Sequence, residues 1–243
     1  MIGAAALTLA TAAMCLGAAR PAANAPFVAV EQAGWSLARA ELARWRRDVP
    51  GKPHVTLIHV RARGPAGTSF EGRGAVAVAP GRALRMILVG PAGRTALDLW
   101  ADDRRHRVSV PDLDVVESGT GEARFPVALL RDLLVEPFAG RLLAAGRRGD
   151  ERVFVLRREG PRARALEVRV RPEGGGKNRY TVARRDALDG QSVTWRGVRA
   201  WPSVGDELVV RHPKMGVELR VELEALSQEA PDAAAFDEPL GGA

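Results

Sequence analysis

Residues 82–99 read RALRMILVGPAGRTALDL, and the pattern of this stretch decides the fold class. Apolar residues occupy alternate positions before the turn at 90–93 and again after it, as is typical of strands with one buried face. The turn reads Gly-Pro-Ala-Gly, in which proline presets φ and glycine accepts positive φ. The segment therefore predicts an antiparallel hairpin, which by itself is compatible with many β-proteins.

The same alternation continues along most of the chain. Strands dominate from Val55 onward, and we expect them at 68–79, 82–89, 94–101, 105–110, 113–117, 152–158, 164–171, 178–185, 192–199, 206–212 and 216–226. Residues 31–47 carry apolar side chains at helical spacing, and shorter helices are expected at 125–134, with Pro126 in the first turn, and at 138–145. So many half-buried strands must curl or close. We predict a mainly β protein with a helical insert: one curved antiparallel sheet forming an incomplete barrel capped by short helices.

Composition and charge narrow the class of function. Of 243 residues, 46% are hydrophobic and 5% aromatic, and the net charge is +7. The arginines are spread through expected strands without a dense basic tract, so we interpret them as solvated strand faces and expect no nucleic-acid partner. Such an excess of positive charge favours contact with an anionic lipid surface.

The first 25 residues differ in kind from the rest. Residues 2–16 are uncharged and rich in alanine and leucine, and small residues follow. This pattern resembles a secretory signal, so we expect export to the periplasm or the periplasmic face of the outer membrane. Cys15 is the only cysteine and lies where a bacterial lipoprotein is acylated, although Ala12–Met14 match a lipobox poorly. Lipidation at Cys15 and removal of the cysteine with the signal both remain open.

Motifs for catalysis or metal binding do not occur in the sequence. It contains no HExxH, GxSxG, Walker A or paired-cysteine motif, so we predict neither an enzyme nor a cofactor or metal site. Asp102, Asp103 and His106 are close in sequence, but their setting indicates an exposed hairpin turn. The other three histidines lack ligand spacing.

Several segments together resemble the LolA/LolB family of outer-membrane lipoprotein localisation proteins, and the LolB branch most closely. Residues 86–99 are similar to its Leu-rich strand, Pro-x-Gly turn and Thr-x-Leu-x-Leu strand, and 70–74 to its Phe-x-Gly-x-Gly strand. A Pro-containing, Leu-rich segment at 125–134 and a Trp-Pro pair at 201–202 before the last two strands also match in order.

The resemblance implies an incomplete barrel whose hydrophobic cavity holds the acyl chains of lipoproteins or other lipids. A periplasmic carrier protein is a further implied partner, as is the membrane surface if the chain is acylated. The residues expected to face the cavity are Phe70, Val76, Val78, Leu84, Met86, Leu88, Leu97 and Leu99, and those expected to form its lid are Phe125, Leu129, Leu130 and Leu133.

One position departs from the LolB pattern. There, the residue between proline and glycine of the hairpin turn is a large exposed hydrophobe, whereas here Pro91 is followed by Ala92, which offers little area for membrane contact. We expect one lipid-binding domain over 26–227 and a flexible acidic tail over 228–243. The alternative is a periplasmic interaction or sensor domain on the same scaffold, without a lipid-carrier role; an envelope hydrolase is a weaker one.

Overall fold

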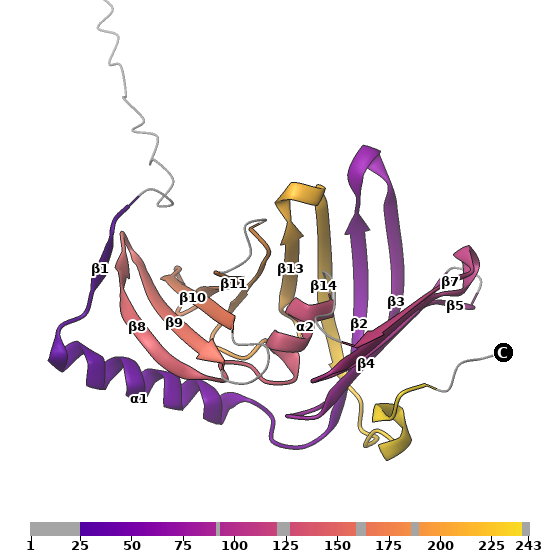
Figure 1. Cartoon of the computed structure of the whole chain (residues 1–243), viewed down its shortest axis with the longest axis horizontal. Coiled ribbons are helices and arrows are strands. Elements are labelled where there is room, and N and C mark those ends of the chain that lie inside the picture. The colour runs from indigo at the N-terminus through magenta and orange to yellow at the C-terminus, as the bar shows by residue number, and fades with distance from the viewer. Residues whose placement is uncertain (1–24, 91–92, 121–126, 159–163, 186–189, 240–243) are drawn as a thin grey trace, which may run out of the picture.

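One large antiparallel sheet makes up most of the molecule, as seen in a computed structural model that describes residues 25–90, 93–120, 127–158, 164–185 and 190–239 (Figure 1). Its fourteen strands lie in the order β1-β8-β9-β10-β11-β12-β13-β14-β2-β3-β4-β5-β6-β7. They are β1 Phe27–Ala29, β2 His54–Arg63, β3 Ser69–Ala79, β4 Ala83–Val89, β5 Thr95–Asp102, β6 Arg105–Val110, β7 Val115–Thr120, β8 Arg141–Arg148, β9 Glu151–Arg158, β10 Arg164–Pro172, β11 Asn178–Arg184, β12 Ser192–Gly197, β13 Glu207–His212 and β14 Val217–Leu226.

Pairing between distant parts of the sequence brings the two halves of the sheet together. The last strand, β14, pairs with β2, so that Val221 lies opposite Val60 and Leu219 opposite Ala62. Strands β1 and β7 form the two edges, and the sheet curves between them without closing (Figure 1). The mainly β class and the incomplete barrel predicted from the sequence are therefore confirmed.

Two α-helices within the described ranges cover the concave face. The long helix α1 (Gln32–Asp48) packs against β8, and its Trp45 ring lies 4.7 Å from that of Phe154 on β9. The short helix α2 (Val127–Leu134) contacts β4 and β5 on one side and β12 on the other, so it lies inside the curve of the sheet (Figure 1). Neither helix is long and apolar enough to cross a membrane.

The helix expected over 138–145 is wrong, because 138–140 form a turn and strand β8 begins at Arg141. Phe138 and Gly140 have φ of 57° and 105°, which interrupt a helical path. From Arg141 onward the backbone pairs with β9, and Gly146 to Arg148 pair also with β1 on the other side. A Cβ on Gly146 would lie 2.3 Å from the Val28 carbonyl oxygen, so glycine is required for the β1–β8 pair. Leucine and alanine favour a helix locally, but pairing on both sides overrides that preference.

The segment after β14 packs on the convex face instead of extending freely. The 3-10 turn η5 (Ala233–Phe236) buries Phe236 against Ala79 and Ala83, and the Trp100 indole donates a hydrogen bond to the Phe236 carbonyl at 3.0 Å. The Arg82 guanidinium pairs with Asp237 at 2.6 Å. The tail expected to be flexible from residue 228 therefore contains an anchored segment.

Candidate functional site

A cavity of about 520 Å³ lies on the concave face, in the half of the molecule that α1 does not cover. Its wall comes from β14 and from β2 through β7, and α2 closes one end. The lining residues are Val60, Ala62, Phe70, Met86, Leu88, Ala96, Leu97, Leu99, His106, Val108, Val110, Glu117, Val127, Leu130, Met215, Val217, Leu219 and Val221. Among these described residues only His106 and Glu117 carry polar side chains. The cavity has the size of a small-molecule site and a largely aliphatic surface.

Glycines on β3 allow the sheet to bend tightly around this space. A Cβ on Gly74 would lie 1.9 Å from the Ile87 carbonyl oxygen of β4, closer than two such atoms can approach. A strand with glycines at alternate positions typically bends or approaches another element closely, and here Gly74 approaches β4. The absence of a side chain at Gly74 lets β4 pair closely with β3 beside the cavity.

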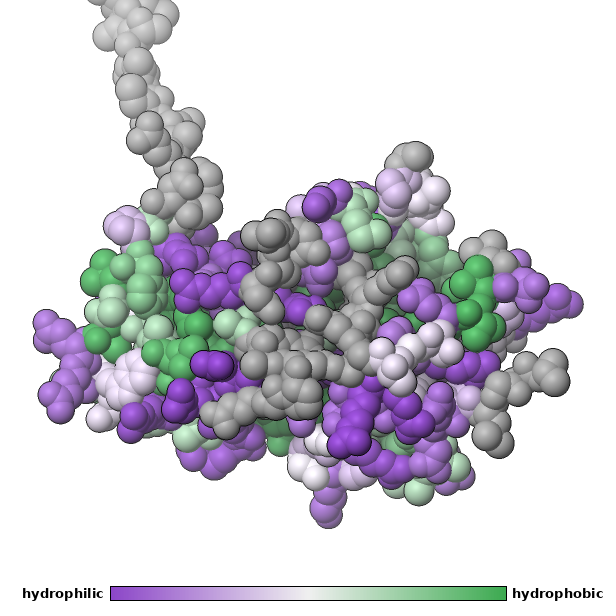
Figure 2. Space-filling model, in the orientation of Figure 1, coloured by the Kyte–Doolittle hydropathy of each residue, from purple (hydrophilic) through white to green (hydrophobic). Residues whose placement is uncertain are grey.

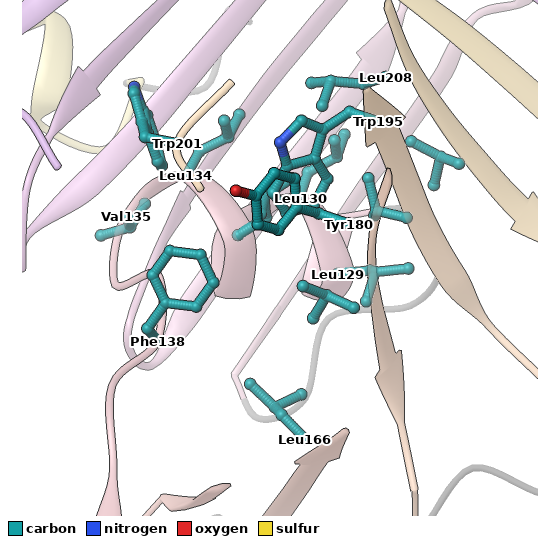
Figure 3. Packing of buried hydrophobic residues seen from close by; sticks show 14 of the residues in the cluster. Leu129, Leu130, Leu134, Val135, Phe138, Leu166, Tyr180, Trp195, Trp201 and Leu208 are labelled. Carbon is teal, nitrogen blue, oxygen red and sulfur yellow. The ribbon is translucent and has the colours of Figure 1, made fainter. Parts of the chain in front are cut away.

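The other half of the concave face is filled by side chains. Tyr180 and Trp195 stack with ring centroids 5.3 Å apart, and Trp45 packs edge-on against Phe154. Figure 3 shows this cluster, in which leucines of α2 converge with Tyr180, Trp195 and Phe138. Burial raises the pKa of the Tyr180 phenol above its ordinary value, although a hydrogen bond with Asn178 opposes that shift. This half is a packed core, and the cavity of about 520 Å³ lies in the half formed by β14 and β2 to β7.

Buried charges hold α2 in place between the two halves. Asp132 accepts a hydrogen bond from Arg158 of β9 at 2.5 Å and lies 3.3 Å from Arg131, and its side chain has no exposed surface. Arg131 also donates to the Asp102 and Asp103 carbonyl oxygens at the β5–β6 turn. The C-terminal half of α2 is thus tied to both sides of the sheet, while Val127 and Leu130 face the cavity.

The residues predicted to face a cavity divide into two groups. Phe70, Met86, Leu88, Leu97 and Leu99 line the cavity. Val76, Val78 and Leu84 lie deeper on the same strands and are buried in the core.

The predicted lid residues divide in the same way. Leu130 lines the cavity, whereas Leu129 and Leu133 are buried in the core. Phe125, the exposed turn Pro91–Ala92 and Cys15 lie outside the described residues.

Three further lining residues, Val217, Leu219 and Val221, lie on β14 and are not among the predicted cavity residues. Their alternation was visible, but their place beside β2 follows from a long-range pairing that the sequence does not reveal.

His106 departs from the exposed turn expected for it. Asp102 does cap the β5–β6 turn, accepting from the Arg104 and Arg105 amides at 2.7 and 2.5 Å. His106, however, is 7% exposed and lines the cavity. No group of three metal-ligating side chains occurs in the part of the chain that the structure describes.

The two faces of the sheet carry opposite chemistry. On the convex face Glu218 accepts hydrogen bonds from Arg211 and Arg220, both at 2.8 Å, and these guanidinium groups hold the pKa of its carboxylate below the usual value. Ion pairs across and along the strands thus cover the convex face, whereas the concave face beside α2 is aliphatic.

The end of the sheet opposite the α2 anchor forms an apolar rim. The turns η2 (Pro65–Gly67), η3 (Pro111–Leu113) and η4 (Pro213–Met215) lie there with the end of β4 at Val89. Exposed hydrophobic side chains on or beside these turns are Phe70, Val89, Val115, Val116 and Met215. Figure 2 shows hydrophobic surface gathered over β7 at this part of the molecule.

Comparison with solved structures supports the fold. No protein-family model and no curated protein matches the sequence. The crystal structure of a LolA superfamily protein from Nitrosomonas europaea matches with a TM-score of 0.52 and 14% identity, over 83% of this chain and 97% of that one. A candidate outer membrane lipoprotein-sorting protein domain from Vibrio parahaemolyticus matches with a TM-score of 0.44 and 11% identity, over 81% of this chain and 95% of that one. The match to the Nitrosomonas europaea structure shows that the chain has a LolA/LolB-like fold.

Proposed function

We propose that this protein binds the acyl chains of lipids or lipoproteins in its concave cavity and serves lipoprotein transport or insertion at the outer membrane. The observation that carries the proposal is the aliphatic cavity of about 520 Å³ between β14, β2–β7 and α2. Concave sites lined by aliphatic side chains bind apolar ligands. The role is binding, because acyl-chain transfer needs a shaped apolar surface and no catalytic group.

The energetics of such binding are sufficient for a carrier. Each buried methylene contributes about 0.8 kcal/mol, so ten methylenes contribute about 8 kcal/mol. Association costs several kcal/mol in lost freedom of the ligand, which leaves a moderate net affinity. A carrier needs that moderate affinity, since the ligand must also leave. Exposed side chains on the apolar rim, such as Phe70 and Met215, lie where an acyl chain would pass between the cavity and a membrane or a partner.

Export and anchoring belong to the same proposal. The uncharged N-terminal segment directs the chain out of the cytoplasm, and acylation of Cys15 would anchor it to a membrane. Metabolic labelling with a radioactive fatty acid, comparing wild type with Cys15→Ser, tests the anchor. Label in the wild type alone supports acylation, and equal labelling of both rejects it.

The binding role itself is tested by native mass spectrometry of the protein purified from its envelope fraction. We expect mass additions that match lipid or acylated peptide and vanish under denaturing conditions. Titration with N-phenyl-1-naphthylamine, an apolar fluorescent reporter, should then show one saturable site. A protein that carries no lipid and does not bind the reporter would contradict the proposal and leave the interaction or sensor role on the same scaffold.

A further inference from the structure

The segment after β14 docks on the convex face, on the opposite side of the sheet from the cavity (Figure 1). Side chains of β3 to β6 and of the β3–β4 turn receive it, and we call this set the tail site: Ala79, Arg82, Ala83, Trp100, Arg105 and Arg107. From Gln228 to Pro239 the only buried residue is Phe236. A segment that is held by one buried side chain can detach locally while the sheet stays folded.

Phe236 is the apolar anchor of this contact. Its side chain is 3% exposed and packs against the small side chains of Ala79 and Ala83. The Arg82 guanidinium lies over the ring, 5.9 Å from its centroid, as in cation–π contacts. The Trp100 indole donates a hydrogen bond to the Phe236 carbonyl at 3.0 Å, which fixes the backbone beside the ring. One aromatic anchor with polar groups around it is the usual centre of a protein interface.

Two carboxylates follow the anchor, and each has its own arginine. Arg82 pairs with Asp237 at 2.6 Å, and Arg105 pairs with Glu238 at 2.5 Å. Both pairs are exposed, so each contributes little to the stability of the fold. Charge complementarity of this kind contributes specificity more than affinity. The tail site thus matches a large apolar residue that is followed directly by two acidic residues.

The sheet itself leaves this site positively charged. Elsewhere on the convex face, arginines pair with carboxylates of a neighbouring strand. Arg107 instead lies opposite Trp100 on one side and Ser118 on the other, and neither is acidic. Within the described ranges, the acceptor of its side chain is the Pro239 carbonyl at 3.4 Å and no carboxylate. Without the tail, the site therefore presents guanidinium groups around an apolar centre, which an acidic peptide complements.

We propose that the tail site is a docking surface for a partner protein that presents an acidic peptide with a phenylalanine anchor, and that the tail occupies it until the partner displaces it. The seated tail shows which sequence the site accepts. Because the tail belongs to the same chain, its effective concentration is high, and a peptide binds only while the tail is detached. The inference is independent of lipid binding, since the tail site and the cavity lie on opposite faces of the sheet.

A fluorescent peptide with the sequence of residues 230–239, APDAAAFDEP, is the probe. Fluorescence anisotropy measures its affinity for the full wild-type chain and for the full chain with Phe236→Ala, in which the resident tail loses its anchor. We expect the variant to bind the peptide about 10- to 100-fold more tightly than the wild type, because the tail no longer competes. A peptide whose phenylalanine is replaced by alanine should bind the variant at least about 10-fold more weakly.

Charge variants test whether the carboxylates are recognised. In the Phe236→Ala chain, the added change Arg105→Gln should weaken peptide binding about 2- to 5-fold, and salt should reduce that effect. Arg73→Gln is the matched control, because Arg73 is an exposed arginine of β3 that pairs with Glu224 outside the tail site, and it should leave the affinity unchanged. Equal effects of the two changes, or equal affinities of the two peptides, would show nonspecific attraction to positive charge and overturn the inference.

A measurement on the wild type keeps the test independent of how the variants fold. The same peptide with a nitroxide at its N-terminus, added in excess, should broaden the Trp100 indole ¹⁵N–H signal in NMR and leave that of Trp45, in the other half of the sheet, sharp. A Trp100 signal that stays sharp would overturn the inference. Light scattering adds a second check: a wild-type mass that doubles with protein concentration would assign the site to the tail of a second copy and overturn the assignment to a partner.

Discussion

Removal of the buried Asp132 carboxylate measures how strongly buried charge anchors α2. The variant Asp132→Ala removes the partner of Arg158, whose nitrogen lies 2.5 Å from the carboxylate, and of Arg131 at 3.3 Å. Removing one partner of a buried ion pair costs about 3–5 kcal/mol, because the remaining charge stays buried. Here Arg158 keeps its ion pair with Glu136, and Arg131 keeps two backbone carbonyls. We therefore expect the lower end, about 3 kcal/mol.

Urea unfolding followed by tryptophan fluorescence measures this loss of stability. A partly exposed ion pair serves as the control for the buried one. Asp98→Ala breaks the two-hydrogen-bond pair with Arg85 across β4–β5, at 3.0 and 2.8 Å. That pair is partly exposed, with side chains 26% and 21% accessible, so its loss should cost about 1 kcal/mol or less.

A double variant separates the missing charge from the missing contacts. Asp132→Leu combined with Arg158→Met replaces the pair with apolar groups and should regain most of the stability lost in Asp132→Ala. Equal losses for Asp132→Ala and Asp98→Ala would refute the argument that buried charge fixes α2.

Three further predictions concern other parts of the fold. Tyr180 is the only tyrosine, and burial raises its pKa. Burial of the neutral phenol therefore stabilises the fold fully below about pH 10, and this stabilisation is lost as pH rises through the folded-state pKa. Absorbance at 295 nm should increase only above pH 10 or with alkaline unfolding. A simple titration at pH 10 in the folded protein would contradict this. Phe236→Ala should lower the free energy of unfolding by about 3 kcal/mol in urea, because it empties the site against Ala79 and Ala83; a loss under 1 kcal/mol would show that η5 contributes little. Gly74→Ala should cost at least about 2 kcal/mol in thermal unfolding, whereas Gly51→Ala, with no atom within 4 Å of its Cβ, should stay within about 0.5 kcal/mol; equal effects would reject the close β3–β4 approach.

The strands were predictable because the pattern of one buried face is local. Alternation over 82–89 and 216–226 places the strands within one residue of β4 and β14. The same pattern says which face is buried but not what covers it. Val76 and Leu88 alternate in the same way on neighbouring strands, yet one is packed in the core and the other borders open space. Only the position of α2 across the sheet separates them.

The predictions that were wrong concern residues whose structure depends on long-range contacts. Residues 141–148 contain good helix formers, and pairing with β1 and β9 makes them a strand. His106 follows a polar turn and therefore reads as exposed, while the curvature of the sheet turns its ring into the cavity. Phe236 lies in an acidic, Ala-rich tail, and its docking depends on a convex-face site between β3 and β5. None of these contacts leaves a local signal.

The cavity is the central claim, and a chain-length series on a blocked variant tests it most directly. Ala62 lies on the concave face of β2 beside Phe70 and Leu219, so Ala62→Phe places a ring in the cavity. If the ring displaces three methylenes at about 0.8 kcal/mol each, affinity for an acyl methyl ester falls about 50-fold. The control Leu57→Phe changes an exposed residue of the same strand that does not line the cavity.

Calorimetric titration with methyl esters of eight to sixteen carbons gives the decisive result. We predict that wild-type affinity rises about 4-fold per added methylene and then levels off when the cavity is full. Ala62→Phe should level off at a shorter chain, and Leu57→Phe should behave as wild type. Identical curves for all three proteins, or no dependence on chain length, would contradict acyl binding in the cavity.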